Sequence, residues 1–330
     1  MNRFETMSAA ALQAMIHVLD LQPDDQVLVV TDQQTRTCGD AFARGAERHG
    51  CPVETYVLRE ADRPLKSLPN DLRNSLADAN VVINAIVGDH REVPFRIEWI
   101  RAIEDNGTIR LGHSPGIDED MMVSGPMNVD YGKMLATAGD LMAGFADASE
   151  VRITTPAGTD LRLNLAGRHF THDLKATVEV GANLPCGEIY CAPLETGADG
   201  LLIVDGCFGC NGMVPTPIAI TVNAGQAVDV TGDNDEIVGI INRLMDTDSG
   251  SRTIAELGIG LNPGARLTER MLEAEKAHHT AHIAFGSNEG FPGGINHSTM
   301  HIDYLVLRPT MEILLSGGKS RLVMEDGEPV

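Results

Sequence analysis

The sequence predicts an α/β protein in which an N-terminal domain with an open α/β sheet is followed by a strand-rich α+β domain. In the first part of the chain, short apolar runs alternate with helical segments, the pattern of a sheet with helices on both faces. From residue 151 the pattern changes to alternating strands separated by short turns. We therefore place the domain boundary near residue 150, with domains over 1–150 and 151–330.

The first domain is expected to hold a parallel sheet. Its predicted helices span 5–19 and 38–49, and its predicted strands are the runs at 27–32, 52–58, 80–88 and 108–115. Loops at the carboxyl ends of such strands are the usual ligand sites of an open α/β sheet, and these loops contain His90 and His113. No glycine-rich phosphate-binding motif follows the first strand, so a nucleotide cofactor is not predicted.

The second domain is expected to begin with a hairpin. Residues 151–167, VRITTPAGTDLRLNLAG, alternate apolar and polar side chains around a PAG turn. A helix over 133–149 leads into this domain, and two more helices are expected at about 234–247 and 266–280.

Composition limits the partners of the chain. Its 330 residues carry a net charge of −22, whereas nucleic acids and anionic membranes are bound by basic surfaces. Neither partner is therefore expected. No apolar run approaches the length of a membrane span, and the first residues lack the apolar core of a signal peptide. We expect a cytoplasmic protein.

Four of the six cysteines lie close together in the sequence: Cys186, Cys191, Cys207 and Cys210. A cytoplasmic location disfavours structural disulfides. Four thiols could hold a structural zinc ion, but their spacing fits no standard finger. We interpret them as small, buried apolar residues.

Histidines and an aspartate near the end of the chain suit a metal site. His301 and Asp303, in MHIDYLVL, are two positions apart in a predicted strand, so they share one face and can reach one ion. His282, in HHTAHIAFGSN, either opens a strand or shares a helical face with His278. We interpret His282 as a ligand and His278 and His279 as structural.

Two glutamates add to this set. Glu256, in AELGIGLNPGA, lies among glycines and apolar residues and is placed to point into a cleft. Glu188, in NLPCGEIYCAP, lies at the start of a predicted strand that proline and glycine flank. Carboxylate oxygen and neutral imidazole are ligands for zinc, manganese, cobalt and ferrous iron. The sequence therefore predicts one or two divalent metals and leaves open whether the metal activates water or dioxygen.

The motifs of this domain resemble, in order, those of the thermophilic aminopeptidase T family. The matching runs are GTDL (158–161), NLPCGEIYCAP (183–193), AELGIGLNP (255–263), HIAFG (282–286) and HIDY (301–304). That family binds two divalent metals through two glutamates, two histidines and an aspartate. Carried over motif by motif, the ligands here are Glu188, Glu256, His282, His301 and Asp303.

In length the chain looks more like 2,5-dihydroxypyridine 5,6-dioxygenase, a relative that uses one ferrous iron. The resemblance implies that this iron is held by a histidine at the position of Glu256 and by an H-x-D pair matching His301 and Asp303. The present chain has glutamate at the first position and keeps Glu188 and His282 as well. The ligand set therefore favours the two-metal hydrolase.

The first hypothesis is a metallohydrolase with two zinc, cobalt or manganese ions that cleaves an amide of a small molecule or short peptide. One of Glu188 and Glu256 would bridge the metals, and the other could be a ligand or act as the general base; we favour Glu256 for the proton transfer. His90 or His113 would bind the substrate or act as an acid. The resembling families form homo-oligomers, so a homo-oligomer is expected.

The second hypothesis is a dioxygenase that opens a hydroxylated nitrogen heterocycle with one Fe(II). The iron would be held by two histidines and one carboxylate, namely His282, His301 and Asp303. Glu188 or Glu256 would then act as a base on the ring hydroxyl.

Overall fold

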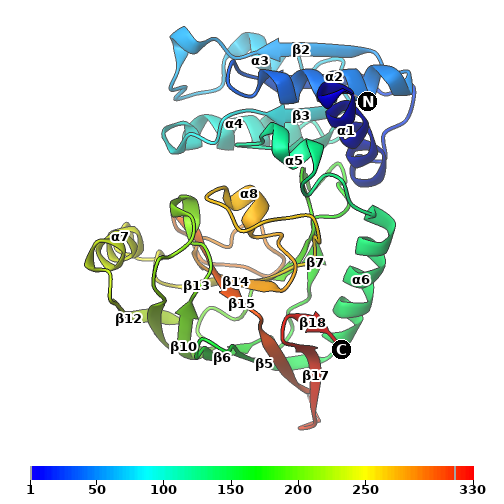
Figure 1. The fold of residues 1–330 in the computed structure, drawn as a ribbon. Helices are drawn as coiled ribbons and strands as arrows, with labels where there is room; N and C mark the ends of the chain where they lie inside the picture. The colour runs from blue at the N-terminus through cyan, green and yellow to red at the C-terminus, as the bar shows by residue number, and fades with distance from the viewer. Residues whose placement is uncertain (1, 316) are drawn as a thin grey trace. The chain divides into compact units, whose positions relative to one another are not determined.

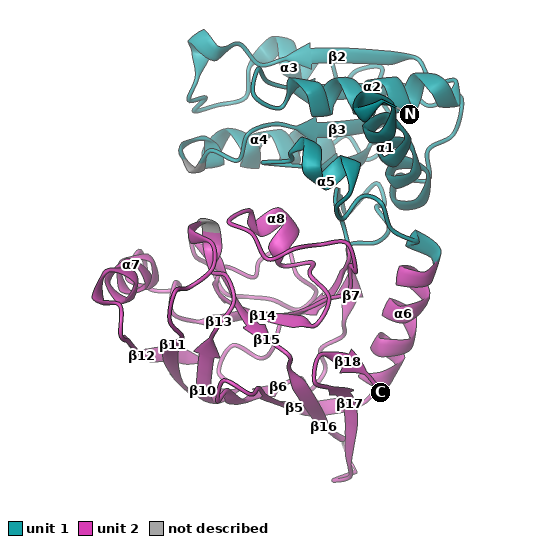
Figure 2. Ribbon diagram, in the orientation of Figure 1, with its two compact units in different colours: residues 1–132, 173–186 teal, residues 133–172, 187–330 magenta. Residues whose placement is uncertain are grey.

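The chain divides into two compact units in a computed structural model that describes residues 2–315 and 317–330, apart from the side chains of His90 and Cys210. Unit 1 comprises residues 1–132 and 173–186, and unit 2 comprises residues 133–172 and 187–330 (Figures 1 and 2). We predicted one domain boundary, near residue 150. In the structure the chain passes from one unit to the other three times.

Unit 1 is an open parallel sheet with the strand order β2-β1-β3-β4-β8. The strands are β1 (Val27–Thr31), β2 (Val53–Val57), β3 (Val81–Ala85), β4 (Arg110–His113) and β8 (Ala182–Asn183). The helices are α1 (Arg3–Leu19), α2 (Arg36–His49), α3 (Asn70–Asn74), α4 (Val93–Glu104) and α5 (Glu119–Val123), with single 3-10 turns η1 (Glu60–Asp62) and η2 (His90–Glu92). Every residue of β1 and β3 is buried, as expected of apolar runs covered on both faces. The open α/β sheet predicted for this part of the chain is confirmed.

A buried ion network fixes the carboxyl ends of β1 and β3. The carboxylate of Asp32 accepts hydrogen bonds from the backbone N–H groups of Thr35 (3.0 Å) and Val87 (2.6 Å) and from the Arg63 guanidinium (2.6 Å). Arg63 also pairs with the buried Glu92. In many open α/β sheets these strand ends are the ligand site; here the Asp32 carboxylate after β1 is engaged by Arg63 and by backbone N–H groups.

Unit 2 contains two antiparallel sheets. The larger sheet has the order β12-β11-β10-β6-β5-β16-β17-β18, and the smaller has the order β15-β14-β13-β9-β7. The larger is built from β5 (Ala148–Thr154), β6 (Asp160–Asn164), β10 (Ala198–Val204), β11 (Ile218–Asn223), β12 (Gln226–Gly232), β16 (Thr310–Leu315), β17 (Ser320–Glu325) and β18 (Glu328–Pro329). The smaller is built from β7 (Thr171–His172), β9 (Glu188–Cys191), β13 (Ile254–Gly260), β14 (Thr280–Gly286) and β15 (His301–Leu307). The strand-rich second part is therefore confirmed, as is its first hairpin, in which Thr154 pairs with Asp160.

The three helices of unit 2 are shorter than the three predicted. They are α6 (Tyr131–Gly144), α7 (Asp235–Met245) and α8 (Met271–Ala274), with one 3-10 turn, η3 (Gly209–Asn211). The helix predicted over 266–280 is wrong, because only the four residues of α8 are helical. The N–H of Asn262 donates to the carbonyl of Lys276 (2.8 Å) and the N–H of His278 donates to the carbonyl of Asn262 (3.2 Å), so this backbone pairs with a distant segment instead.

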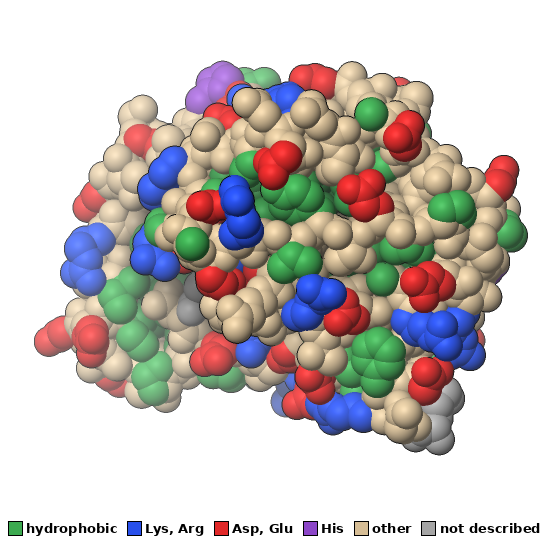
Figure 3. Space-filling view, turned by 90° about the horizontal axis from the view of Figure 1, so that it is seen from above, with side chains coloured by type: hydrophobic (Ala, Val, Ile, Leu, Met, Phe, Trp, Pro, Cys, Tyr) green, Lys and Arg blue, Asp and Glu red, His purple; other side chains and the backbone are tan. Residues whose placement is uncertain are grey.

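On the face drawn in Figure 3, acidic and basic side chains are interspersed with scattered apolar groups. Among the helices of the described residues, none is both long enough and apolar enough to cross a membrane.

Replacing Asp32 by alanine is expected to destabilise unit 1 by about 3–5 kcal/mol, because Arg63 and Glu92 lose part of a buried ion network. Asp40→Ala is the matched control, since Asp40 forms an exposed i,i+4 pair with Arg36 whose loss costs under about 1 kcal/mol. Urea unfolding followed by hydrogen exchange of β1 measures the difference, and equal losses in the two variants would contradict it.

The same network makes stability depend on pH. Burial alone would raise the pKa of Asp32, but the N–H groups of Val87 and Thr35 and the charge of Arg63 lower it below its ordinary value. A depressed carboxyl pKa stabilises the fold above the ordinary value of about 4, and the stabilisation disappears as the pH falls through the folded-state pKa.

Candidate metal centre

One face of the smaller sheet in unit 2 gathers the five side chains that the sequence singles out. Glu188 opens β9, Glu256 lies in β13, His282 lies in β14, and His301 and Asp303 lie in β15. In the register of the sheet, Ala284 stands between Glu256 and Asp303. His282 faces Gly258, His301 faces Gly286 and Glu188 faces Gly260. Each functional side chain therefore has glycine or alanine as a cross-strand neighbour, which leaves space above the sheet.

Gly258 shows how strict this requirement is. A Cβ atom built on Gly258 would lie 1.9 Å from Nε2 of His282, far inside van der Waals contact. Only glycine at this position leaves room for the His282 imidazole where it lies.

The five donors form two overlapping groups that share Glu256. In the first group, Nε2 of His282 lies 3.4 Å from Oε2 of Glu188 and 3.5 Å from Oε1 of Glu256. In the second, Nε2 of His301 lies 3.0 Å from Oε2 of Glu256 and 3.5 Å from Oδ1 of Asp303. Within each group the donor atoms all lie within 4.8 Å of one another. The two oxygens of Glu256 thus face different histidines.

The donor side chains are largely buried, and their carboxylates require nearby positive charge. Glu188, Glu256, His282 and Asp303 are each exposed by less than a tenth, while the His301 side chain is 31% exposed. Burial alone would raise the pKa of Glu256 and lower that of His282. The attraction between them overrides burial, so the pKa of Glu256 falls below its ordinary value and that of His282 rises to about 9. Buried carboxylates need paired cations, which protonated imidazoles or divalent ions can supply.

The donor set fits a divalent ion. Nδ1 of His301 donates to the backbone carbonyl of Ser287 at 2.7 Å, since a carbonyl can only accept. In the neutral ring this leaves the lone pair of Nε2 directed at the carboxylates. Metal-ligating histidines are typically oriented in this way, by donating their other ring N–H to a carbonyl or carboxylate. Nδ1 of His282 is buried and has no hydrogen-bond partner in the part of the chain that the structure describes.

Two residues that the sequence reasoning missed lie beside this centre. Lys276 is completely buried, and its ammonium contacts Oε1 of Glu188 and lies 2.6 Å from Oε1 of Glu275. Their motif, AEKAHH, falls in the segment predicted as a helix, where Glu and Lys neighbours indicate a solvated face. The sequence held no signal that distinguished these residues from an exposed charged turn.

The predicted substrate-binding histidines belong to unit 1. His113 ends β4, where its Nδ1 lies 3.0 Å from Nδ2 of Asn84, and Oδ1 of Asn84 in turn accepts from the Trp99 indole (2.6 Å). Burial lowers the pKa of His113 to about 4, so its ring is neutral at pH 7. The side chain of His90, in η2, lies outside the described residues. Their role in substrate binding stays a prediction.

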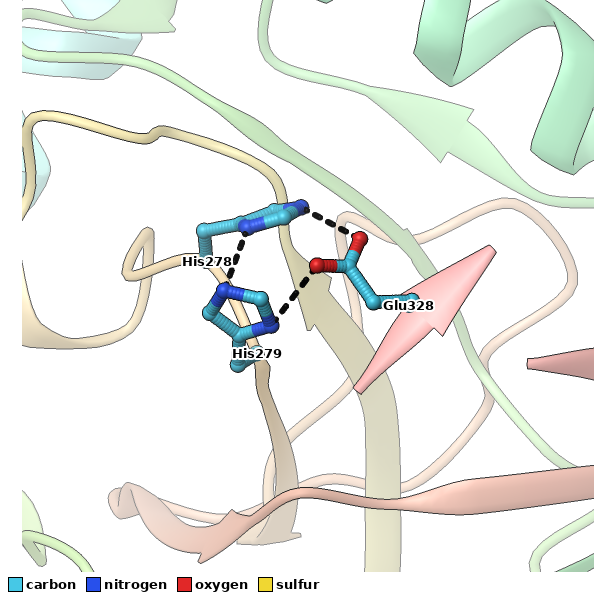
Figure 4. Close-up of side chains that lie close together, drawn as sticks. All are labelled: His278, His279 and Glu328. Atoms are coloured by element: carbon cyan, nitrogen blue, oxygen red, sulfur yellow. Dashed lines mark hydrogen bonds and ion pairs between the residues drawn. The ribbon is translucent and has the colours of Figure 1, made fainter. Parts of the chain in front are cut away.

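A third group of donors, outside the smaller sheet, is less suited to a metal. His278 and His279 lie in the turn before β14. Oε2 of Glu328 lies 3.8 Å from Nε2 of His278, and Oε1 of Glu328 lies 3.4 Å from Nδ1 of His279 (Figure 4). The other nitrogens of the two rings hydrogen-bond to each other at 3.1 Å. An ion bound by both carboxylate-facing nitrogens would leave two N–H groups pointing at each other, so we assign no metal here.

The described cysteines of the 186–210 cluster, Cys186, Cys191 and Cys207, are all buried. The thiol of Cys207 donates to the carbonyl of Thr268 at 3.2 Å. Among the described residues, the groups of potential metal donors contain no cysteine.

Comparisons with known proteins place these residues in a family context. The model of the thermophilic metalloprotease (M29) family matches residues 139–328, a segment that contains all five donors. Aminopeptidase AmpS of Bacillus subtilis is 25% identical over 195 residues, covering 52% of this chain and 47% of AmpS. Aminopeptidase T of Thermus thermophilus is 28% identical over 175 residues, covering 47% and 42%. In these alignments the chain spans about half the length of the curated relatives it matches.

Two solved structures share the fold over nearly the whole chain. AmpT from Thermus thermophilus superimposes with a TM-score of 0.74 and 19% identity, covering 98% of this chain and 99% of AmpT. The 2,5-dihydroxypyridine dioxygenase from Pseudomonas putida KT2440 superimposes with a TM-score of 0.72 and 16% identity, covering 98% and 97%. At such identities the likeness establishes the fold alone.

Replacing Gly258 by alanine is expected to displace the His282 imidazole and lower the metal content per chain, because the new Cβ occupies the position of Nε2. Gly139→Ala is the matched control, since a Cβ there has no neighbour within 4 Å. Metal analysis of both purified variants measures the effect. Full metal content in Gly258→Ala would show that His282 is not a ligand.

Proposed function

Because the chain belongs to the thermophilic metalloprotease (M29) family, we propose that it is a metal-dependent hydrolase that cleaves the amide bond of a small or short peptide substrate. The observation that carries the proposal is the position of Glu256, whose two oxygens face two separate donor groups. Such sharing suits a pair of divalent ions bridged by one carboxylate. Zinc, cobalt and manganese all accept this mixture of imidazole and carboxylate.

We assign the donors as follows. Glu188 and His282 would hold one ion, His301 and Asp303 would hold the other, and Glu256 would contribute to both. A divalent ion in such a site supplies Lewis acidity and lowers the pKa of bound water. Burial of the donors excludes bulk water and strengthens each charge interaction in the centre.

Glu256 is our candidate for the proton transfer. During amide hydrolysis a water oxygen bonds to the carbonyl carbon, the C–N bond breaks, and a proton from the water reaches the leaving amine. Glu256 lies in the middle of the donor cluster, and its lowered pKa keeps it ionised at neutral pH. A carboxylate with both oxygens bound to ions could not act as a base, so in this role one oxygen of Glu256 would stay with the ions while the other would accept the proton and pass it to the nitrogen.

The surroundings of His301 support an apolar substrate group next to the amide. The Phe291 ring packs edge-on against His301 with centroids 5.5 Å apart, and Tyr190 packs against Phe291 at 5.1 Å. Since His301 is the most exposed of the five donors, these rings form an apolar wall at the accessible side of the centre. We propose that they contact a side chain of the substrate.

The dioxygenase remains the second candidate, because the structural likeness to that enzyme nearly equals the likeness to AmpT. It requires one Fe(II) held by His282, His301 and Asp303. In the described structure, His282 and Asp303 fall into different donor groups, and Glu256 completes both groups. A carboxylate central to the donor set favours the hydrolase.

We further propose a cytoplasmic homo-oligomer, as the family resemblance implies. Light scattering on the purified protein is expected to give a multiple of the 35.4 kDa chain mass. A mass of one chain at micromolar concentration would contradict the oligomer and leave the proposed chemistry unaffected.

Replacing Glu256 by glutamine is expected to lower kcat for hydrolysis of aminoacyl amides by at least about 100-fold, because the amide cannot accept the proton. Glu312→Gln, at an exposed position of β16, is the matched control and should stay within twofold of the wild type. Oxygen uptake with dihydroxypyridines is measured in parallel. Oxygen uptake by the wild type without amide hydrolysis would replace the hydrolase by the dioxygenase.

A further inference from the structure

A buried lysine stands at the edge of the donor cluster and takes no place among the proposed metal ligands. The Lys276 side chain is 0% exposed. It lies two residues after the end of α8, and the backbone around it is held by Asn262, whose N–H donates to the Lys276 carbonyl at 2.8 Å. A charged lysine is buried this completely only when it is paired.

The pairing involves two carboxylates that are themselves almost buried. On one side the ammonium contacts Oε1 of Glu188, whose side chain is 8% exposed. On the other side it lies 2.6 Å from Oε1 of Glu275, whose side chain is 14% exposed. Lys276 thus links a proposed ligand to a carboxylate outside the two donor groups.

This contact gives the two carboxylate oxygens of Glu188 different partners. Oε1 is engaged by Lys276, whereas Oε2 lies 3.4 Å from Nε2 of His282 in the first donor group. A carboxylate can offer a metal one oxygen or two, and it can rotate about its terminal bond. By contacting Oε1, Lys276 leaves Glu188 one oxygen for a metal and restricts the rotation of its carboxylate.

The charge of Lys276 also reaches the second donor group. Burial alone would raise the pKa of Asp303; His301 lowers it most, and His282 and Lys276 add to the effect. Lys276 is therefore a fixed cation within an acidic centre. Removal of Lys276 would leave the Glu275 carboxylate buried without this counter-ion. Removing one partner of a buried ion pair is strongly destabilising, because the other charge stays uncompensated.

We propose that Lys276 is a positioning residue that sets Glu188 as a one-oxygen donor to the first group, with Glu275 as its counter-ion. The inference rests on the proposed metal centre and concerns the order and affinity with which ions bind. Replacing a residue that contacts and orients a metal ligand typically lowers metal affinity by about 10- to 100-fold.

The test compares zinc binding by the metal-free wild type, Lys276→Met, the double variant Lys276→Met/Glu275→Gln, and the control Lys319→Met. Lys319 is an exposed lysine of the same unit. The double variant is decisive, because it removes the uncompensated Glu275 charge together with Lys276 and so keeps the protein folded if the single variant unfolds. Calorimetric titration gives the number of ions bound and the affinity of each.

The expected result is that the double variant retains one ion at wild-type affinity and binds the other about 10- to 100-fold more weakly, while Lys319→Met binds both as the wild type does. Two ions at wild-type affinity, or tighter binding of either ion, in the double variant would overturn the inference, since Lys276 would then only neutralise Glu275. A wild type that binds no zinc, cobalt or manganese would instead refute the proposed function.

Discussion

The burial of three carboxylates on one face of a five-stranded sheet is the constraint on which the rest of unit 2 depends. Glu188, Glu256 and Asp303 are each nearly removed from water, and a buried carboxylate is costly unless a cation faces it. His282, His301 and Lys276 balance these three charges only while both imidazoles are protonated. When both imidazoles are neutral, two negative charges are left unpaired, and under the proposed function divalent ions would balance them.

Small residues of the sheet leave space for these charged side chains. Gly258, Gly260, Ala284 and Gly286 occupy the cross-strand positions opposite the functional side chains. They weaken the packing of the strands themselves, because glycine and alanine bury little apolar surface. The opposite face of β13 and β14 is fully apolar, and Leu257, Ile259, Ile283 and Phe285 are buried there, so these two strands still bury apolar surface beside the polar centre.

Much of this arrangement was predictable from local patterns. The strand alternation identified the fold class, and the spacing of His301 and Asp303 placed both on one strand face. Lys276 and Glu275 were not predictable, because their partners are fixed by contacts across the fold: Lys276 reaches Glu188, 88 positions away. The helix expected over 266–280 is limited to α8 for the same reason. The backbone around Lys276 forms hydrogen bonds with Asn262 instead of continuing a helix.

The central claim is that Glu256 is shared by two ions, and locating the ions tests it most directly. Crystals of protein purified without chelators, measured on both sides of the absorption edge of the metal that it contains, give anomalous peaks at the ion positions. The account predicts two peaks, one among Glu188, Glu256 and His282 and one among Glu256, His301 and Asp303. A single peak bounded by His282, His301 and Asp303 alone would contradict it.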